Sequence, residues 1–159
     1  DYRRDRVPQP DPRCSQENLS NLGPLMSELT GQKVDAMDMR AWRFWVSYLG
    51  LGYLQEMFMI PNADVFLQDV IALAGLEKGK KYSFGEFINR ISPYCGIIMD
   101  ENLKNRRLSY GMSNGLRTLH DAGILKMEHF LDQKDIWTLY PLSVHPIRDT
   151  VTNITIGGK

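Results

Sequence analysis

The order of patterned segments between Asn62 and Tyr140 constrains the fold of this chain more than any other feature of its sequence. Apolar residues recur at helical spacing in three stretches, 62–74, 84–92 and 100–122. Strand-like sequence lies at Tyr82, 124–131 and 136–140. The predicted order is helix, short strand, helix, helix, strand, turn and strand, which indicates an α+β fold that is mainly helical.

Local signals predict where the first two of these helices begin and end. Asn62 is placed to cap the first helix with its side chain. Ser83 and Glu86 have the spacing of a capping box at the start of the second. Ser92-Pro93 should end that helix, because a residue before proline avoids the helical region.

The third helical stretch is rich in basic and polar residues. Asp100 can cap it, Gly123 should stop it, and it either runs through or restarts at Ser109. Its inward row is Leu108, Met112, Leu116 and Leu119. Gly111 and Gly115 each cost a helix roughly 1 kcal/mol relative to alanine, and they leave room for another backbone to approach.

The chain before Asn62 divides into two parts. Residues 1–14 are rich in proline and charge and are expected to form a flexible arm. Residues 15–61 form an N-terminal extension that begins with a short helix in 15–30, interrupted at Gly23-Pro24.

The rest of this extension carries a second helix and a strand. Asp38 is expected to cap the helix, and Tyr53–Ile60 to form one strand. The predicted inward row of the helix is Trp42, Trp45, Val46 and Leu49. The extension either packs its tryptophans on the main core or is a second, degenerate copy of the domain that follows.

Composition excludes several classes of protein. The 19 basic and 19 acidic residues give a net charge of zero, which excludes a strongly basic nucleic-acid packaging protein. With 43% hydrophobic and 24% charged residues, wholesale disorder is excluded too. The two cysteines exclude a disulfide-stapled scaffold and indicate a cytoplasmic location, and we expect no membrane span.

The element order resembles the winged-helix branch of the helix-turn-helix superfamily. The stretch Leu116–Leu125 is similar to the end of a recognition helix in that superfamily, where a glycine and an apolar pair open the first wing strand. The resemblance covers residues 62–142, with a C-terminal strand and tail at 143–159. One departure is the apolar link Tyr94–Met99, which is longer than the usual tight turn.

The resemblance implies binding of double-stranded DNA, with the third helix in the major groove, as part of a larger transcription regulator or DNA-processing protein. Arginine and asparagine suit base or phosphate contacts, and residues 102–118 carry four basic residues and no acid. The expected DNA-contacting residues of this helix are Lys104, Arg106, Arg107, Tyr110, Ser113, Asn114 and Arg117, with the last four on its outward face. Lys80 and Lys81 would add a second phosphate contact.

An alternative is a winged-helix module that binds proteins inside a multi-subunit complex or as a homodimer. The predicted wing, residues 126–135, carries three acids against two lysines, and phosphate would repel it. The neutral total charge also suits assembly. The contact surface would be the region 39–60, rich in Trp and Met, or an open strand edge.

No enzyme chemistry is predicted. His120, His129 and His145 lack metal-ligand spacing, so no metal or other cofactor is expected. Cys95 stands in an apolar stretch, where a thiol is typically buried and inert. No catalytic residue is proposed.

Overall fold

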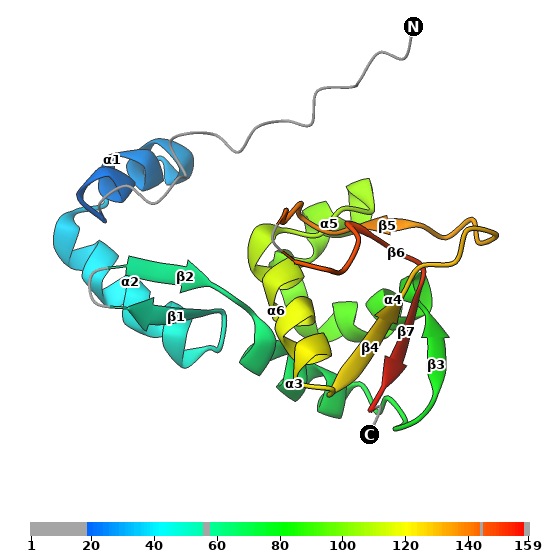
Figure 1. Cartoon of the computed structure of the whole chain (residues 1–159). Helices are drawn as coiled ribbons and strands as arrows, with labels where there is room; N and C mark the ends of the chain where they lie inside the picture. Colours follow the sequence, from blue (N-terminus) through cyan, green and yellow to red (C-terminus); the bar gives the residue numbers. More distant parts are fainter. Residues whose placement is uncertain (1–18, 56–57, 144, 158–159) are drawn as a thin grey trace, which may run out of the picture. The chain divides into compact units, whose positions relative to one another are not determined.

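The computed structural model of the chain describes residues 19–55, 58–143 and 145–157 and has an α+β fold (Figure 1). The described residues divide into two compact units. One holds the residues up to Trp45 together with 54–60, and the other holds 46–53 and the residues from Pro61 onward. The expected arm at 1–14 lies outside the described residues. No helix in the described part of the chain combines the length and the apolar character that crossing a bilayer requires.

The first unit contains α1 (Leu19–Thr30), most of α2 (Ala36–Tyr48), the end of β1 (Gly52–Gln55) and most of β2 (Phe58–Pro61). The last three residues of α2, the first two of β1 and Pro61 belong to the second unit. Helix α1 runs through Gly23-Pro24 without a break, so the predicted interruption is wrong. The prediction of a single strand at Tyr53–Ile60 is also wrong, because β1 and β2 pair with each other in a two-stranded sheet.

Helix α2 is capped by Asp35, not by Asp38 as predicted. Asp35 Oδ1 accepts hydrogen bonds from the backbone N–H groups of Met37 (2.7 Å) and Asp38 (3.0 Å). Asp38 Oδ2 accepts in return from the N–H of Asp35 (3.0 Å). The two carboxylates therefore satisfy three amides that the first turn leaves without helical partners.

The buried face of α2 also differs from the prediction. Met39 is 2% exposed and Arg43 is 8% exposed, whereas Trp45 is 62% and Leu49 is 54% exposed. Apolar residues occupy both sides of this helix. Helical spacing alone therefore predicted burial for Trp45 and Leu49, which are exposed. Trp137, by contrast, is a core residue, with 4% of its surface exposed.

The second unit begins with helices wrapped around one core. Its helical elements are α3 (Asp64–Leu73), α4 (Phe84–Cys95), a 3-10 helix η2 (Gly96–Ile98), α5 (Asp100–Asn105) and α6 (Tyr110–Asp121). Asn62 Oδ1 accepts from the N–H of Asp64 (3.2 Å) at the start of α3, and Ser83 Oγ accepts from that of Glu86 (3.1 Å) in α4. Ser83 therefore caps α4 as predicted, whereas Ala63 holds the cap position of α3, so the prediction that Asn62 caps this helix is wrong by one residue.

Helix α4 does not end at Ser92-Pro93 as predicted. It continues to Cys95, with Pro93 inside its last turns. Proline has no N–H to donate to the carbonyl of Asn89, and Ser92 Oγ donates to that oxygen instead (3.1 Å). The predicted loop at Tyr94–Met99 is therefore mostly helical.

The third predicted helix is two helices, of which the second restarts after Ser109. Arg106 has a left-handed backbone (φ 47°) that ends α5. Asp100 lies inside α5 and does not cap it, because Met99 occupies the cap position. The restart at Ser109 was one of the two expected outcomes.

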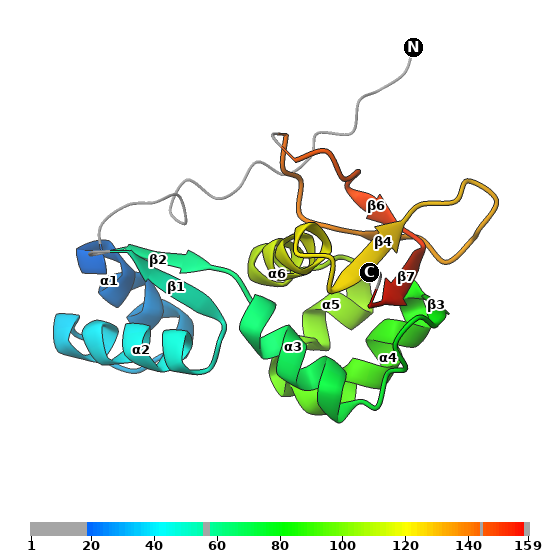
Figure 2. The ribbon, with the colours of Figure 1, turned by 60° about the horizontal axis from the view of Figure 1, so that its bottom comes forward.

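The strands of this unit form two small antiparallel sheets. They are β3 (Lys81–Ser83), β4 (Leu125–Glu128), β5 (Trp137–Thr138), β6 (Thr150–Val151) and β7 (Asn153–Ile156). Strand β7 lies between β3 and β4, and both Lys81 and Lys126 stand opposite Thr155 (Figure 2). Strands β5 and β6 pair separately.

The predicted hairpin between 124–131 and 136–140 is therefore wrong. Strand β4 pairs with β7, and residues 129–149 intervene between β4 and the β6–β7 run. Thr152, between β6 and β7, keeps the run connected: its N–H donates to Glu128 O (3.0 Å), and its carbonyl accepts from Phe84 N (2.8 Å).

Between these strands and the helices lies the core. Helix α6 packs against α3 and β4, and α4 packs against β3 and β7 (Figure 2). The most deeply buried side chains of this core include Leu67, Phe84, Phe87, Ile88, Ile91, Met112, Leu116, Leu139 and Ile154.

Candidate functional site

Helix α6 is the element on which the predicted DNA-binding residues were placed. Its apolar row is buried as predicted, with Met112, Leu116 and Leu119 each no more than 1% exposed. Gly115 faces the start of α3, where an added Cβ would lie 2.7 Å from the carbonyl carbon of Ala63. The small residue thus permits close helix packing inside the protein, where we had expected the approach of a ligand backbone.

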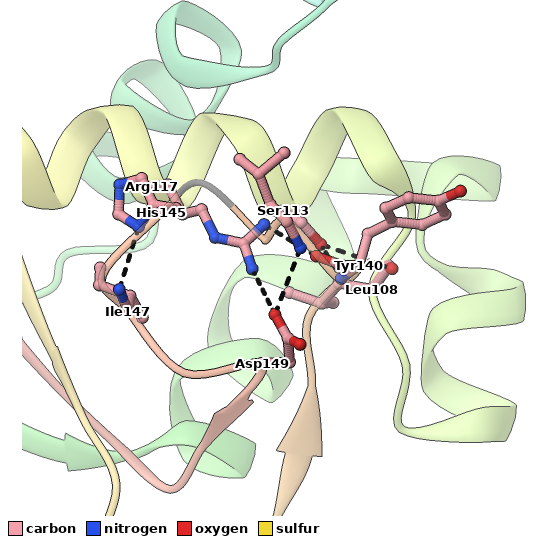
Figure 3. A network of polar contacts seen from close by, with 8 residues as sticks. Leu108, Ser113, Arg117, Tyr140, His145, Ile147 and Asp149 are labelled. Carbon is pink, nitrogen blue, oxygen red and sulfur yellow. Dashed lines mark hydrogen bonds and ion pairs between the residues drawn. The ribbon is translucent and has the colours of Figure 1, made fainter. Parts of the chain in front are cut away.

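Two of the four residues predicted on the outward face of α6 are buried. Ser113 is 0% exposed and Arg117 is 2% exposed. Residues 139–143 and 145–149, which we call the strap, cross this face of the helix (Figure 3). The prediction that Ser113 and Arg117 face solvent is wrong, because a segment from more than twenty residues later in the chain covers them.

Ser113 and Arg117 hold the strap by both backbone groups of one residue (Figure 3). Ser113 Oγ accepts from the N–H of Tyr140 (2.8 Å), and Arg117 Nη1 donates to the carbonyl of Tyr140 (2.8 Å). Arg117 Nη2 donates to Asp149 Oδ1 at 3.1 Å, which is also an ion pair. The strap closes on itself through Leu139 N–H, which donates to the carbonyl of Asp149 (2.7 Å).

Arg117 carries a buried positive charge whose ion-pair partner is Asp149. Burial lowers the pKa of its guanidinium, and the nearby Asp149 carboxylate opposes that shift. Its Nε is buried and has no hydrogen-bond partner among the described residues. A buried charge of this kind is tolerated only where its partner stays in place, so the strap and Arg117 depend on each other.

The other two predicted face residues are partly accessible but engaged within the chain. Tyr110 is 40% exposed, and its ring meets the ring of Tyr140 edge-on, with centroids 5.0 Å apart. Asn114 is half-buried and donates from Nδ2 to the carbonyl of Pro61 (3.1 Å). These contacts turn both side chains toward protein neighbours.

The predicted basic residues are mostly exposed, and three of them have acidic partners. Lys80 pairs with Glu77 (2.8 Å), Lys81 with Glu128 (3.0 Å) and Arg106 with Asp135 (3.4 Å). Lys104 is exposed at the end of α5, and Arg107 is half-buried. Acids thus offset much of the positive charge that the prediction relied on.

An open groove of about 780 Å³ lies between the start of α4, the end of α5 and residues 134–137. Within it, Asp135 accepts from the N–H of Gly85 (3.0 Å) and from Trp137 Nε1 (3.2 Å). Asp135 also pairs with Arg106. Asp135 therefore already engages three of the donors that line the groove, Gly85 N–H, Trp137 Nε1 and the Arg106 guanidinium.

The described residues offer no grouping of three His, Cys, Asp or Glu side chains that would hold a metal ion. Burial raises the pKa of the Cys95 thiol to about 11, which keeps it protonated at neutral pH. Cys95 therefore lacks the thiolate character that a nucleophile requires.

Helix α2 presents an exposed apolar face that overlaps the region 39–60, the contact surface of the alternative prediction, although Trp45 was expected to face inward. Met37 (75%), Phe44 (62%), Trp45 (62%) and Tyr48 (81%) are strongly exposed, and Ala41 is exposed beside them. We call these five residues the α2 stripe. A sequence signal for it exists, because Met37, Ala41, Phe44 and Tyr48 recur at spacings of four, three and four, which place them on one face of a helix.

Comparisons with protein-family models, with curated proteins and with solved structures find no match. The functional interpretation therefore depends on geometry and chemistry. The relevant features are the covered face of α6 and the exposed stripe of α2.

Proposed function

We propose that this chain is a winged-helix module that binds protein and not DNA. Support for the winged-helix assignment comes from the order α3, β3, α4, α6, β4, β7 and from the sheet order β3-β7-β4. In this reading β4 and β7 flank an enlarged wing, residues 129–149. The added helix α5 accounts for the long link that departs from the usual turn.

The strap argues against DNA reading by α6. Exposing Ser113 and Arg117 requires breaking the contacts to Tyr140 and Asp149. Breaking the Arg117–Asp149 pair, whose carboxylate is 46% exposed, costs about 2–3 kcal/mol, and each lost hydrogen bond to Tyr140 costs about 1 kcal/mol more. A good base contact contributes about 1–3 kcal/mol. Duplex DNA remains the alternative hypothesis, but its contacts would first have to offset the loss of the strap.

The observation that carries the proposal is the exposure of the α2 stripe. Soluble monomers rarely present contiguous apolar patches larger than a few hundred Å² unless they use them. Three exposed aromatic side chains on one helix face do not make the helix more soluble, so their exposure calls for another explanation. Exposed aromatic residues of this kind are typical anchors of protein–protein contacts.

Acrylamide quenching of tryptophan fluorescence at about 1 µM protein tests whether the stripe is accessible in the free chain. We expect Trp45→Phe to remove the most quenchable emission, because Trp45 is 62% exposed, and Trp137→Phe to remove the least, because Trp137 is 4% exposed. If Trp45 proves as protected as Trp137, the stripe is not accessible to solvent and the proposal fails.

A further inference from the structure

We infer that the α2 stripe pairs with the stripe of a second copy of this chain, helix against helix in parallel. This inference rests on the proposed function and names the partner of the same surface. All five stripe residues lie on one uninterrupted helix, Ala36–Tyr48. The geometry of the contact is therefore set by α2 alone.

The spacing of the stripe is that of a coiled-coil seam. Met37, Ala41, Phe44 and Tyr48 fit consecutive d, a, d and a positions of a heptad. The small side chain of Ala41, near the middle of the seam, lets two such helices approach closely. The seam therefore complements itself.

The flanking residues favour a parallel pair over an antiparallel one. In this register Arg40 is a g position, and Asp38 and Trp45 are e positions. A parallel pair sets each exposed Arg40 beside the Trp45 of the second copy, where a guanidinium and an aromatic face attract. An antiparallel pair would instead set Asp38 beside Trp45, and a carboxylate is repelled by the negative face of a ring.

The available area indicates a weak dimer. An aromatic side chain buries about 150–250 Å², so at exposures of 62%, 62% and 81% the three aromatics offer roughly 400 Å² per copy. With Met37 the stripe supplies roughly 500 Å², against about 800 Å² per partner in a standard interface. We therefore expect a weak dimer whose population depends on protein concentration.

Sedimentation equilibrium of the full chain, from about 5 to about 200 µM, tests the pairing. We expect the wild type to pass from monomer to dimer over this range. Phe44→Glu should weaken dimerisation at least tenfold, since it places a carboxylate in the seam. Leu73→Glu is the matched control, because Leu73 is an exposed residue of α3 outside the stripe (65%) and its change should have no effect.

Ala41→Glu is a second seam variant, and it replaces an exposed helical alanine with another good helix former. Circular dichroism confirms that each variant is folded. A wild type that stays monomeric at the highest concentration overturns the inference, as does an undiminished dimer when both seam positions carry glutamate.

Disulfide trapping tests the orientation. In a Cys14→Ser background, Met37→Cys should form a crosslinked dimer on mild oxidation, because a parallel pair brings the two copies of position 37 together. Failure to crosslink in a chain that does dimerise overturns the parallel arrangement.

Fluorescence quenching separates failure of this inference from failure of the proposed function. If the chain stays monomeric and Trp45 is readily quenched, pairing with a second copy is excluded but the proposed function stands. If Trp45 is protected in the monomer, both are excluded.

Discussion

Arg117 Nη1 lies 2.8 Å from the carbonyl oxygen of Tyr140, a residue twenty-three positions later in the chain. One helical turn earlier, Ser113 accepts the N–H of the same tyrosine. Helix α6 thus pairs with the strap as a neighbouring strand would, through one donor and one acceptor. The residues that looked most suited to reading a DNA groove are used to close the fold.

Loss of the Asp149 carboxylate should destabilise the protein markedly. Asp149→Asn leaves the buried Arg117 guanidinium without an anionic partner. Because the Asp149 side chain is itself 46% exposed, we expect the free energy of unfolding to fall by about 2–3 kcal/mol. This is somewhat below the loss of about 3–5 kcal/mol that is typical of fully buried pairs. Urea denaturation measures the change, and Asp132→Asn, at an exposed loop position, is the control. A loss below about 0.5 kcal/mol for Asp149→Asn would show that the pair does not hold the strap.

The hydroxyl of Ser113 should contribute more to the stability of the fold than the hydroxyl of Ser109. Ser113→Ala leaves the N–H of Tyr140 without its acceptor, and a buried unsatisfied donor costs about 1–3 kcal/mol. Ser109→Ala is the matched change, because Ser109 is exposed and makes no side-chain capping bond to α6. We expect Ser109→Ala to stay within about 0.5 kcal/mol of wild type in the same urea titration. Equal losses for the two variants would contradict the assigned role of Ser113.

Replacing each of the two glycines of α6 by alanine should change the stability of the protein in opposite directions. At Gly115 the new Cβ would meet Ala63 backbone at 2.7 Å, so α3 and α6 must separate, at a cost of about 1–3 kcal/mol. At Gly111 the nearest atom is Pro61 Cβ at 3.5 Å, an ordinary contact, and alanine should gain up to about 1 kcal/mol from helix propensity. Thermal unfolding of both variants measures the difference. A Gly115→Ala variant as stable as Gly111→Ala would show that the helices are not packed this closely.

Stability should fall on mild acidification, partly through His120. Burial lowers the pKa of His120, whose Nδ1 accepts the N–H of Met127 (3.0 Å). The unfolded chain then binds the proton more readily, so the free energy of unfolding decreases as pH falls below about 6.5 and levels off once pH passes below the folded-state pKa. His120→Asn keeps an acceptor near Met127, and we expect it to lose less stability than wild type between about pH 7.5 and about pH 5.5. Identical losses in urea titrations at the two pH values would exclude this contribution.

Much of the fold was predictable from local patterns. The inward row of α6, the capping contact at Ser83 and the positions of most helices follow from residues close in sequence. Strand pairing was not predictable in the same way, because the partner of β4 is β7, separated from it by a long insertion.

The candidate site was predicted less well, for two physical reasons. A polar residue such as Arg117 on an amphipathic helix normally faces solvent, and only the distant strap shows that it does not. Helix α2 has apolar residues on two faces, so periodicity predicted the wrong burial for Trp45. In both cases tertiary packing decides an orientation that sequence spacing leaves open.

Titration of a fluorescently labelled duplex of about 20 base pairs, followed by anisotropy at about 50 and about 200 mM salt, tests most directly whether the α6 face is closed. We predict no saturable binding by the wild-type chain up to about 50 µM at the lower salt, because Ser113 and Arg117 are already engaged. Saturable binding that weakens steeply with salt and is lost in Arg117→Ala, in a variant shown to be folded, would contradict the account.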